Sequence, residues 1–192
     1  MMNVKTRPVN VDALRTLMER LLAAIGCDGE TAKAIANVHL EADLRGVSVQ
    51  GLNHLINSHI TDFRRGRIDP AGKPEIVTEG DAYALIEGNH GPGPIAAIYA
   101  AEVAAAKAAK AGCAMVGVRN SDDLFIAGYY VDLIARQGMV GFLFSDDVVC
   151  RIHPLGGTEQ AIGTSPMAIA VPTEGEPFVL DFAPCATLPT YV

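Results

Sequence analysis

Residues 94–118 read PIAAIYAAEVAAAKAAKAGCAMVGV, and this stretch decides the fold. Residues 94–111 are rich in alanine, the residue with the highest helix propensity, so they predict a long helix. The short apolar run 114–118 predicts a buried strand. A second predicted helix, at about residues 126–137, leads to a strand over residues 139–144. The order of strand, helix and strand predicts a right-handed crossover and at least one parallel strand pair.

Further strands flank this segment on both sides. Residues 75–78 and 82–86 predict a hairpin, and residues 167–171 and 178–182 predict two strands that extend the sheet through turns rich in Gly and Pro. We therefore expect residues 71–192 to form an α/β domain with a mixed sheet.

The N-terminal part, residues 1–70, predicts a helical region. Apolar residues recur at three- and four-residue steps over residues 14–25. A second helix is expected over residues 29–45, and a third ends at Gly66.

The composition excludes several classes of protein. With 192 residues, 49% of them hydrophobic, the chain can bury a sizeable core. No apolar run has the length of a membrane span and no secretory signal is present, so we expect a cytoplasmic protein. A net charge of −7 without a basic stripe argues against nucleic acid and membrane partners. The four cysteines stand far apart, which predicts reduced thiols rather than disulfides or a metal site.

Two acidic pairs follow predicted strands. Asp122 and Asp123 come after the strand that ends near residue 118, and Asp146 and Asp147 come after the strand that ends at residue 144. Loops at the carboxyl ends of parallel strands gather at one edge of a sheet. If the two strands are neighbours, these carboxylates share one crevice, as an acid/base pair or around a hard cation.

The acidic pairs have a second interpretation, and the glycine-rich loops have two as well. His90 and His153 are possible companions of the carboxylates, but Asp122 or Asp123 also fits a cap of the helix that begins near residue 126, and Asp146 fits an Asx-turn. Gly156 and Gly157, and the run from Gly163 to Pro166, offer backbone N–H groups of the kind that approach a phosphate, or they form ordinary turns.

Three strings, in this order along the chain, resemble a known family. They are EADLRGVSVQG at residues 41–51, NSDDLFIAGYY at residues 120–130 and IGTSPMAIA at residues 162–170. They are similar to motifs of the malate/L-lactate dehydrogenase-like family of NAD(P)-dependent 2-oxoacid reductases. The resemblance runs from about residue 11 to residue 181, and it implies the sulfolactate dehydrogenase-like fold, which is not a Rossmann fold.

The resemblance implies a cofactor and the residues that hold it. Relatives read Gly-Thr-Asn-Pro in a turn that contacts the cofactor, where this chain reads Gly-Thr-Ser-Pro. We therefore expect NAD or NADP to be bound by a set of polar and glycine residues. These are Asn120, Ser121, Gly156, Gly157, Gly163, Thr164, Ser165 and Pro166.

The same resemblance implies altered chemistry. Relatives carry Ser-His-Gly where this chain has Val49-Gln50-Gly51, and that histidine donates a proton to the substrate carbonyl. The Gln50 amide has no proton to give near neutral pH. Relatives carry an arginine at the position of His54 and a histidine at that of Asp123. The candidate catalytic residues are Gln50, His54, Asp122, Asp123 and Asp146.

Relatives also continue beyond the matching region. Residues 184–192 look like an unfinished connection, and the last strand would leave apolar surface uncovered. We therefore expect the fold to be incomplete without a C-terminal segment or a partner chain, either in a homo-oligomer or in a complex with a second chain.

Three functional hypotheses follow. The first is a family-type oxidoreductase acting on a small 2-oxo or 2-hydroxy acid, with an altered active site. The second is a non-redox hydrolase or lyase on the same scaffold, which uses the Asp pairs and needs no cofactor; one form of this hypothesis makes the chain one half of a cleaved precursor. The third is a non-catalytic subunit.

Overall fold

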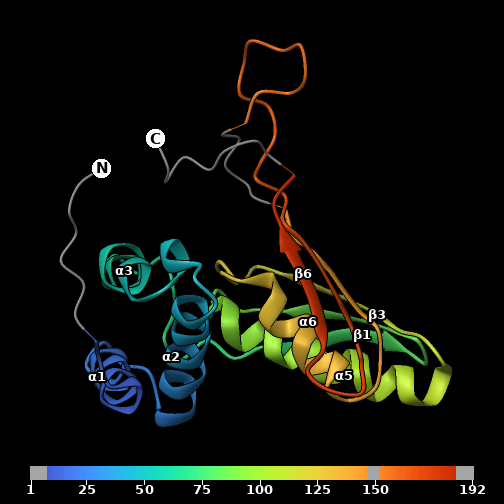
Figure 1. Cartoon of the computed structure of the whole chain (residues 1–192), viewed down its shortest axis with the longest axis horizontal. Coiled ribbons are helices and arrows are strands. Elements are labelled where there is room, and N and C mark those ends of the chain that lie inside the picture. The colour runs from blue at the N-terminus through green and yellow to red at the C-terminus, as the bar shows by residue number, and fades with distance from the viewer. Residues whose placement is uncertain (1–7, 147–151, 185–192) are drawn as a thin grey trace. The chain divides into compact units, whose positions relative to one another are not determined.

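The computed structural model describes residues 8–146 and 152–184 (Figure 1). The chain divides into two compact units, Met1–Gly72 and Lys73–Val192. None of the described helices is both long enough and apolar enough to cross a membrane.

The first unit is helical, as its hydrophobic spacing predicts. Asn10 begins the first helix by accepting a hydrogen bond from the Ala13 N–H at 2.9 Å, and Asp28 begins the second by accepting one from the Thr31 N–H at 2.7 Å. The elements are α1 Val11–Ala23, α2 Gly29–Leu44, the 3-10 turn η1 Ser48–Gln50, α3 Leu52–His54, the π-helical segment η2 Leu55–His59 and α4 Ile60–Arg64.

The core of this unit joins α1 and α2 to the last helical stretch. Buried Met18 and Leu22 of α1 pack in one cluster with Ile35 of α2, Leu55 of η2 and Phe63 of α4. The predicted third helix is present, but its middle turn, η2, is π-helical. Such a widened turn displaces the side chains that follow it and often occurs at functional sites.

The described residues of the second unit form two three-stranded sheets. The elements are β1 Glu75–Gly80, β2 Tyr83–Glu87, α5 Gly93–Ala111, β3 Met115–Arg119, α6 Ala127–Ala135, β4 Gly141–Phe144, β5 Met167–Val171 and β6 Phe178–Phe182. In the first sheet β1 pairs antiparallel with β2, and β2 pairs parallel with β3 across the α5 crossover. A parallel pair and a mixed sheet are therefore present, but the parallel partner of β3 is β2 through α5, and not the strand at residues 139–144 through the helix at residues 126–137 as expected.

The last three strands form a sheet of their own, in which β5 pairs antiparallel with both β4 and β6. This corrects the expectation that the last strands extend one sheet. It also removes the premise that the strands before the two acidic pairs are neighbours, because β3 and β4 lie in different sheets. The pairing depends on contacts far apart in the chain, which periodicity does not encode.

Two helices connect the sheets. The α5 helix packs against β2 and β3, α6 packs against β4, β5 and β6, and the two helices contact each other. Small residues let α6 approach its sheet closely, since Ala127 and Ala135 are buried against Ala168 and Ala170. The α5 helix ends at Gly112, whose φ of 84° suits a glycine C-cap.

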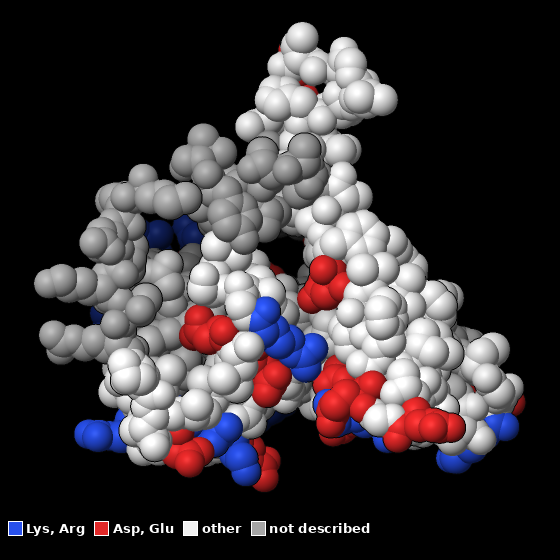
Figure 2. Space-filling view, in the orientation of Figure 1, with Lys and Arg blue, Asp and Glu red and all other residues white. Residues whose placement is uncertain are grey.

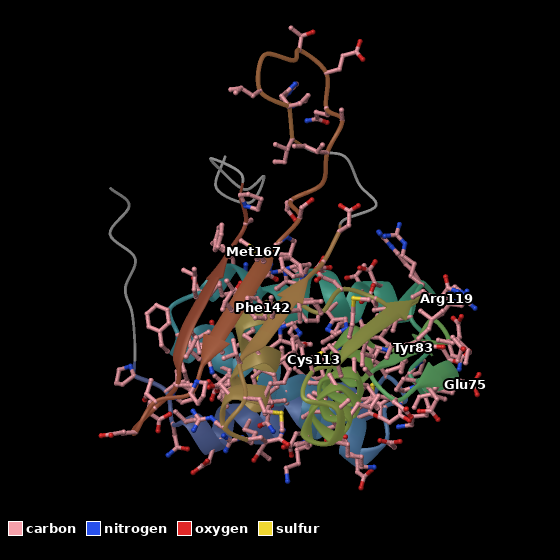
Figure 3. All side chains as sticks on the ribbon, turned by 90° about the vertical axis from the view of Figure 1, so that its right-hand side faces the viewer. Glu75, Tyr83, Cys113, Arg119, Phe142 and Met167 are labelled. Carbon is pink, nitrogen blue, oxygen red and sulfur yellow. The ribbon has the colours of Figure 1, made fainter. Side chains whose placement is uncertain are left out.

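The other face of the β4–β6 sheet is apolar and exposed, and we call it the open sheet face. Phe142 is paired across the strands with Ile169, and Ile169 with Leu180. A second row runs from Phe144 through Met167 to Phe182 (Figure 3 labels Phe142 and Met167). The exposed fractions of the two β4 phenylalanines are 59% and 70%, so α6 leaves this face uncovered.

Candidate functional site

The loops that follow β2 and β3 meet at one edge of the first sheet, because these strands are parallel. The Gly88 N–H donates to the carbonyl of Arg119 at 2.8 Å, and the His90 N–H donates to the carbonyl of Asn120 at 2.8 Å. Figure 3 labels Arg119 at the end of β3. This edge therefore holds the candidate loop with Asn120 and Ser121 in a fixed backbone conformation.

Asn120 has a positive φ of 51° and its side-chain amide donates to Glu87 at 3.2 Å. Glu87 also pairs with Arg119 at 2.8 Å. These hydrogen bonds, that of Asn120 first, lower the pKa of the Glu87 carboxyl. Ser121 is half-buried, and its hydroxyl donates to the carbonyl of Asp122 at 3.4 Å.

Asp123 forms an Asx-turn. Its carboxylate accepts a hydrogen bond from the Phe125 N–H at 2.9 Å, whereas the N-cap position of α6 is Ile126. The expected cap of this helix by Asp122 or Asp123 is therefore wrong, because Asp123 makes a turn before the helix begins. One carboxylate oxygen of Asp123 accepts the hydrogen bond of the turn. Because the residue is exposed, the carboxylate is accessible to solvent.

Tyr130 holds the loop after β3 in place. Its hydroxyl donates to the carbonyl of Leu124 at 2.6 Å, and the side chain is buried. Burial, and then the charge of Asp123, raises the pKa of Tyr130 well above its ordinary value. Nothing in the sequence pointed to this residue beyond the preference of a buried tyrosine hydroxyl for a hydrogen-bond partner.

Two helix N-termini in this unit are occupied by the chain itself. At the start of α5, a Cβ on Gly93 would overlap the carbonyl oxygens of Asp122 and Asp123. At the start of α6, the Gly128 N–H donates to the Asp181 carboxylate at 2.7 Å. Neither terminus therefore presents the open cluster of N–H groups that binds a phosphate.

Asp146 lies beside the predicted cofactor turn. The Ser165 hydroxyl donates to the Asp146 carboxylate at 3.2 Å, and the Ser145 N–H donates to the carbonyl of Pro166 at 3.1 Å. Gly163 is buried and Thr164 is half-buried. The structure thus brings a candidate catalytic residue and candidate cofactor residues together at the ends of β4 and β5.

Gly156 and Gly157 lie elsewhere, on an exposed loop that extends away from the sheets (Figure 1). They form a turn in which the Gly157 N–H donates to the carbonyl of Pro154 at 2.8 Å. A bridge between Ile152 and Ile162 closes the loop at its base. His153 is exposed on this loop, and Asp147 lies outside the described residues.

In the first unit, Gln50 and His54 share one turn. The His54 ring donates from Nδ1 to the carbonyl of Val49 at 3.2 Å. Asp43 supports the turn by accepting a hydrogen bond from the Leu52 N–H at 2.8 Å. The side-chain oxygen of Gln50 is buried and has no hydrogen-bond partner among the described residues. A buried acceptor in this state costs about 1–3 kcal/mol, which a bound donor would offset.

Behind this turn lies a buried pair of histidines. His39 and His59 are 0% and 1% exposed, and their rings are joined by a hydrogen bond of 3.0 Å. The His39 ring also contacts the carbonyl of Gln50 at 2.7 Å and stacks on His54 with ring centroids 6.3 Å apart. The pairing of the two histidines depends on the π-helical turn, which the spacing of residues in the sequence does not predict.

The described residues contain no group of three side chains suited to hold a metal ion. On the face of the described residues that Figure 2 shows, basic side chains lie interleaved with acidic ones. The chemistry available is therefore that of single polar groups at two places, the Gln50 turn in one unit and the Asp146–Ser165 contact in the other.

Together, the fold and these polar loops define an α/β protein in which a helical unit precedes a unit of two sheets. The model of the malate/L-lactate dehydrogenase family matches residues 9–188. The malate dehydrogenase of Pyrococcus abyssi is 37% identical over 172 residues, 90% of this chain and 47% of that protein. The malate/(S)-sulfolactate dehydrogenase of Methanothermus fervidus is 33% identical over 90% of this chain and 50% of its own.

Solved structures agree. Malate dehydrogenase from Entamoeba histolytica superposes with a TM-score of 0.92 at 32% identity, covering 95% of this chain and 51% of that one. The chain belongs to the malate/L-lactate dehydrogenase family, and the expected family and fold are confirmed. It spans about half the length of the relatives that it matches.

Proposed function

We propose that this chain is part of an NAD(P)-dependent oxidoreductase that acts on a small 2-oxo or 2-hydroxy acid through an altered active site. Relatives bear names such as malate dehydrogenase and, in Escherichia coli, ureidoglycolate dehydrogenase (NAD(+)). The observation that carries the proposal is the buried oxygen of Gln50 without a partner among the described residues. A substrate hydroxyl is a donor that fits it.

The cofactor would be held at the ends of β4 and β5. Because the starts of α5 and α6 are occupied by Asp123 and Asp181, the backbone from Gly163 to Pro166 is the better candidate for the cofactor. Ser165 and Asp146 supply a hydroxyl and a carboxylate there. Bound nicotinamide supplies or removes a hydride at the substrate carbon.

The proton of the reaction must come from another group. Gln50 orients the substrate oxygen by hydrogen bonding but cannot release a proton. His54 donates from Nδ1 to a backbone carbonyl, so Nε2 is the ring nitrogen left to contact a substrate. In the protonated form His54 would also attract a substrate carboxylate. We therefore assign proton transfer and carboxylate binding to His54, and orientation to Gln50.

The open sheet face supports the proposed partner. Its two rows of apolar side chains would be covered by a second copy of this chain or by a second polypeptide.

Calorimetry with NADH and NADPH tests the cofactor assignment. We expect binding in the micromolar range and, for Ser165→Ala, an affinity reduced about fivefold, since a hydrogen bond contributes about 1 kcal/mol. Thr173→Ala, at the opposite end of the same sheet, should bind as the wild type does. Absence of heat at millimolar cofactor would remove the redox proposal.

The other hypotheses have less support. The hydrolase or lyase rested on shared carboxylates, and the premise that β3 and β4 are neighbouring strands is wrong. The non-catalytic subunit stays a prediction that the same calorimetry addresses.

A further inference from the structure

The buried histidine pair connects three elements of the first unit. His39 lies on α2, His59 lies on the π-helical segment η2, and the carbonyl that His39 contacts belongs to Gln50 of η1. Phe63 packs against the His59 ring with centroids 4.9 Å apart. The contacts therefore form a continuous chain from η2 through α2 to the turn that carries Gln50.

The hydrogen bonds determine which ring nitrogens carry protons. A carbonyl oxygen only accepts, so His39 donates to Gln50 from Nδ1. In a neutral His39, Nε2 then has no proton and accepts, so His59 must donate from Nδ1 across the 3.0 Å contact. Both rings are therefore neutral Nδ1–H tautomers.

The buried His39–His59 pair accommodates little positive charge. One added proton places a charge in a site where both rings are at most 1% exposed. With a proton on every ring nitrogen, two N–H groups would face each other across the contact, and the hydrogen bond would be lost. The pair therefore titrates as a unit.

We propose that His39 and His59 form a pH-sensitive latch, a buried neutral pair that stabilises the packing of the Ser48–Gln50 turn, α2 and η2 at neutral pH and weakens this packing in acid, where the pair would have to bury a charge. The device stands independently of the proposed activity, because it rests on a buried contact within one helical unit. It uses two histidines to which the proposed reaction gives no role.

The charged surroundings favour neutral rings. The titratable group that acts on both is His54, whose proximity lowers their pKa values further. On α2 itself, the Asp43 carboxylate is engaged by the Leu52 N–H. On α1, which packs against α2, Arg15 pairs with Asp12 at 2.8 Å.

The direction of the pH dependence follows from linkage. Burial lowers the pKa of His39 from 6.5 to about 4, and burial followed by the charge of His39 lowers the pKa of His59. Between the folded and unfolded pKa values the unfolded chain binds more protons, so stability is complete above about pH 6.5 and falls as the pH falls toward 4. For His39 alone, the folding equilibrium constant should fall about 30-fold by pH 5.

Urea unfolding from pH 8 to pH 5, followed by circular dichroism because the chain has no tryptophan, measures this loss. In His39→Asn the amide can replace Nδ1–H toward Gln50, and in His59→Asn it can replace Nδ1–H toward His39. Each variant should reduce the acid-induced loss of the folding constant by at least tenfold. The control His90→Asn changes an exposed histidine of the other unit and should retain the wild-type loss.

Nitrogen-15 spectra of the histidine rings test the latch without any variant. In the folded protein at pH 5.5 we expect His39 and His59 to be neutral and protonated at Nδ1. Rings that titrate near pH 6.5 in the folded state, or Asn variants with the same pH dependence as the wild type, would overturn the proposal. If the variants do not fold, the ring spectra decide alone.

Discussion

At the scale of single residues, the candidate chemistry depends on what Gln50 and His54 can exchange with a substrate. The two lie on one turn, which His39 and Asp43 hold from within the same unit. An amide at position 50 offers hydrogen bonds of fixed direction, whereas an imidazole also exchanges a proton near neutral pH. The residue at position 50 therefore sets the rate of a reduction more than the affinity for its substrate.

Restoring an acid at this position should raise 2-oxoacid reduction. We expect Gln50→His, with His54 left in place, to increase the rate in the assembled protein by up to the factor of about 10² to 10⁴ that a general acid usually contributes. Steady-state oxidation of NADH with pyruvate or oxaloacetate measures it. Asn57→His, which adds a histidine at an exposed position of η2, should leave the rate unchanged. Rapid turnover by the wild type would contradict the role we assign to the substitution.

The sequence predicted Gln50 and His54 as candidate site residues, but it did not predict which side chains hold their turn in place. A histidine at position 39 or 59 is compatible with solvent, a cap or a core. Only the π-helical turn at Leu55–His59 brings the second ring within 3.0 Å of the first. The role of Tyr130 was not predictable for the same reason, because it depends on a hydrogen bond to the Leu124 carbonyl that forms only in the fold.

At the scale of elements, the start of α5 and the loop after β3 are packed against each other without space for a side chain. Gly93 begins α5, and the carbonyl oxygens of Asp122 and Asp123 lie where its Cβ would be. This contact gives the loop its position relative to the helix and closes the helix start to anions. The glycine is therefore required by packing rather than by its backbone angle.

Adding one methyl group at this point should destabilise the second unit. We expect Gly93→Ala to lower the free energy of unfolding by about 1–3 kcal/mol, the usual cost of overpacking, because backbone atoms must move. Chemical denaturation measures it. Gly175→Ala is the matched control, since nothing lies within 4 Å of a Cβ there, and it should change stability by less than about 0.5 kcal/mol. Equal stabilities for the two variants would contradict the packing argument.

The elements themselves were largely predictable. Alanine content predicted α5, and short apolar runs predicted β3, β4, β5 and β6, because these signals are local. The division of strands between two sheets was not predictable, since Phe142 pairs with Ile169 across a separation of 27 positions. The crevice expected between the two acidic pairs required β3 and β4 to be neighbouring strands, and they lie in different sheets.

At the scale of the whole molecule, each unit has its own core, and the second also has the open sheet face. Burying a phenylalanine or leucine side chain contributes roughly 1.5–3 kcal/mol, so covering Phe142, Phe144 and Leu180 together is a substantial driving force for association. An uncovered apolar face of this kind is typical of an interaction surface.

We expect the isolated chain to associate through this face. Light scattering beside denaturing mass spectrometry should show a species larger than 20.2 kDa under native conditions. Phe142→Lys with Leu180→Lys should shift it toward the monomer, because the two paired charges would have to be desolvated. Leu155→Lys instead removes a still more exposed apolar side chain from the loop and should leave association unchanged. A monodisperse folded wild-type monomer would show that the face needs no cover.

The loop that carries Gly156 and Gly157 is a suitable place to insert a foreign peptide. Its chain enters and leaves through Ile152 and Ile162, which are bridged to each other, and Leu155 between them is fully exposed. Exposed loop tips with closed bases are the places where folds accept inserted peptides. An epitope or a fluorophore attachment sequence placed after Leu155 would therefore report on the protein while the strand register of β4, β5 and β6 stays as it is.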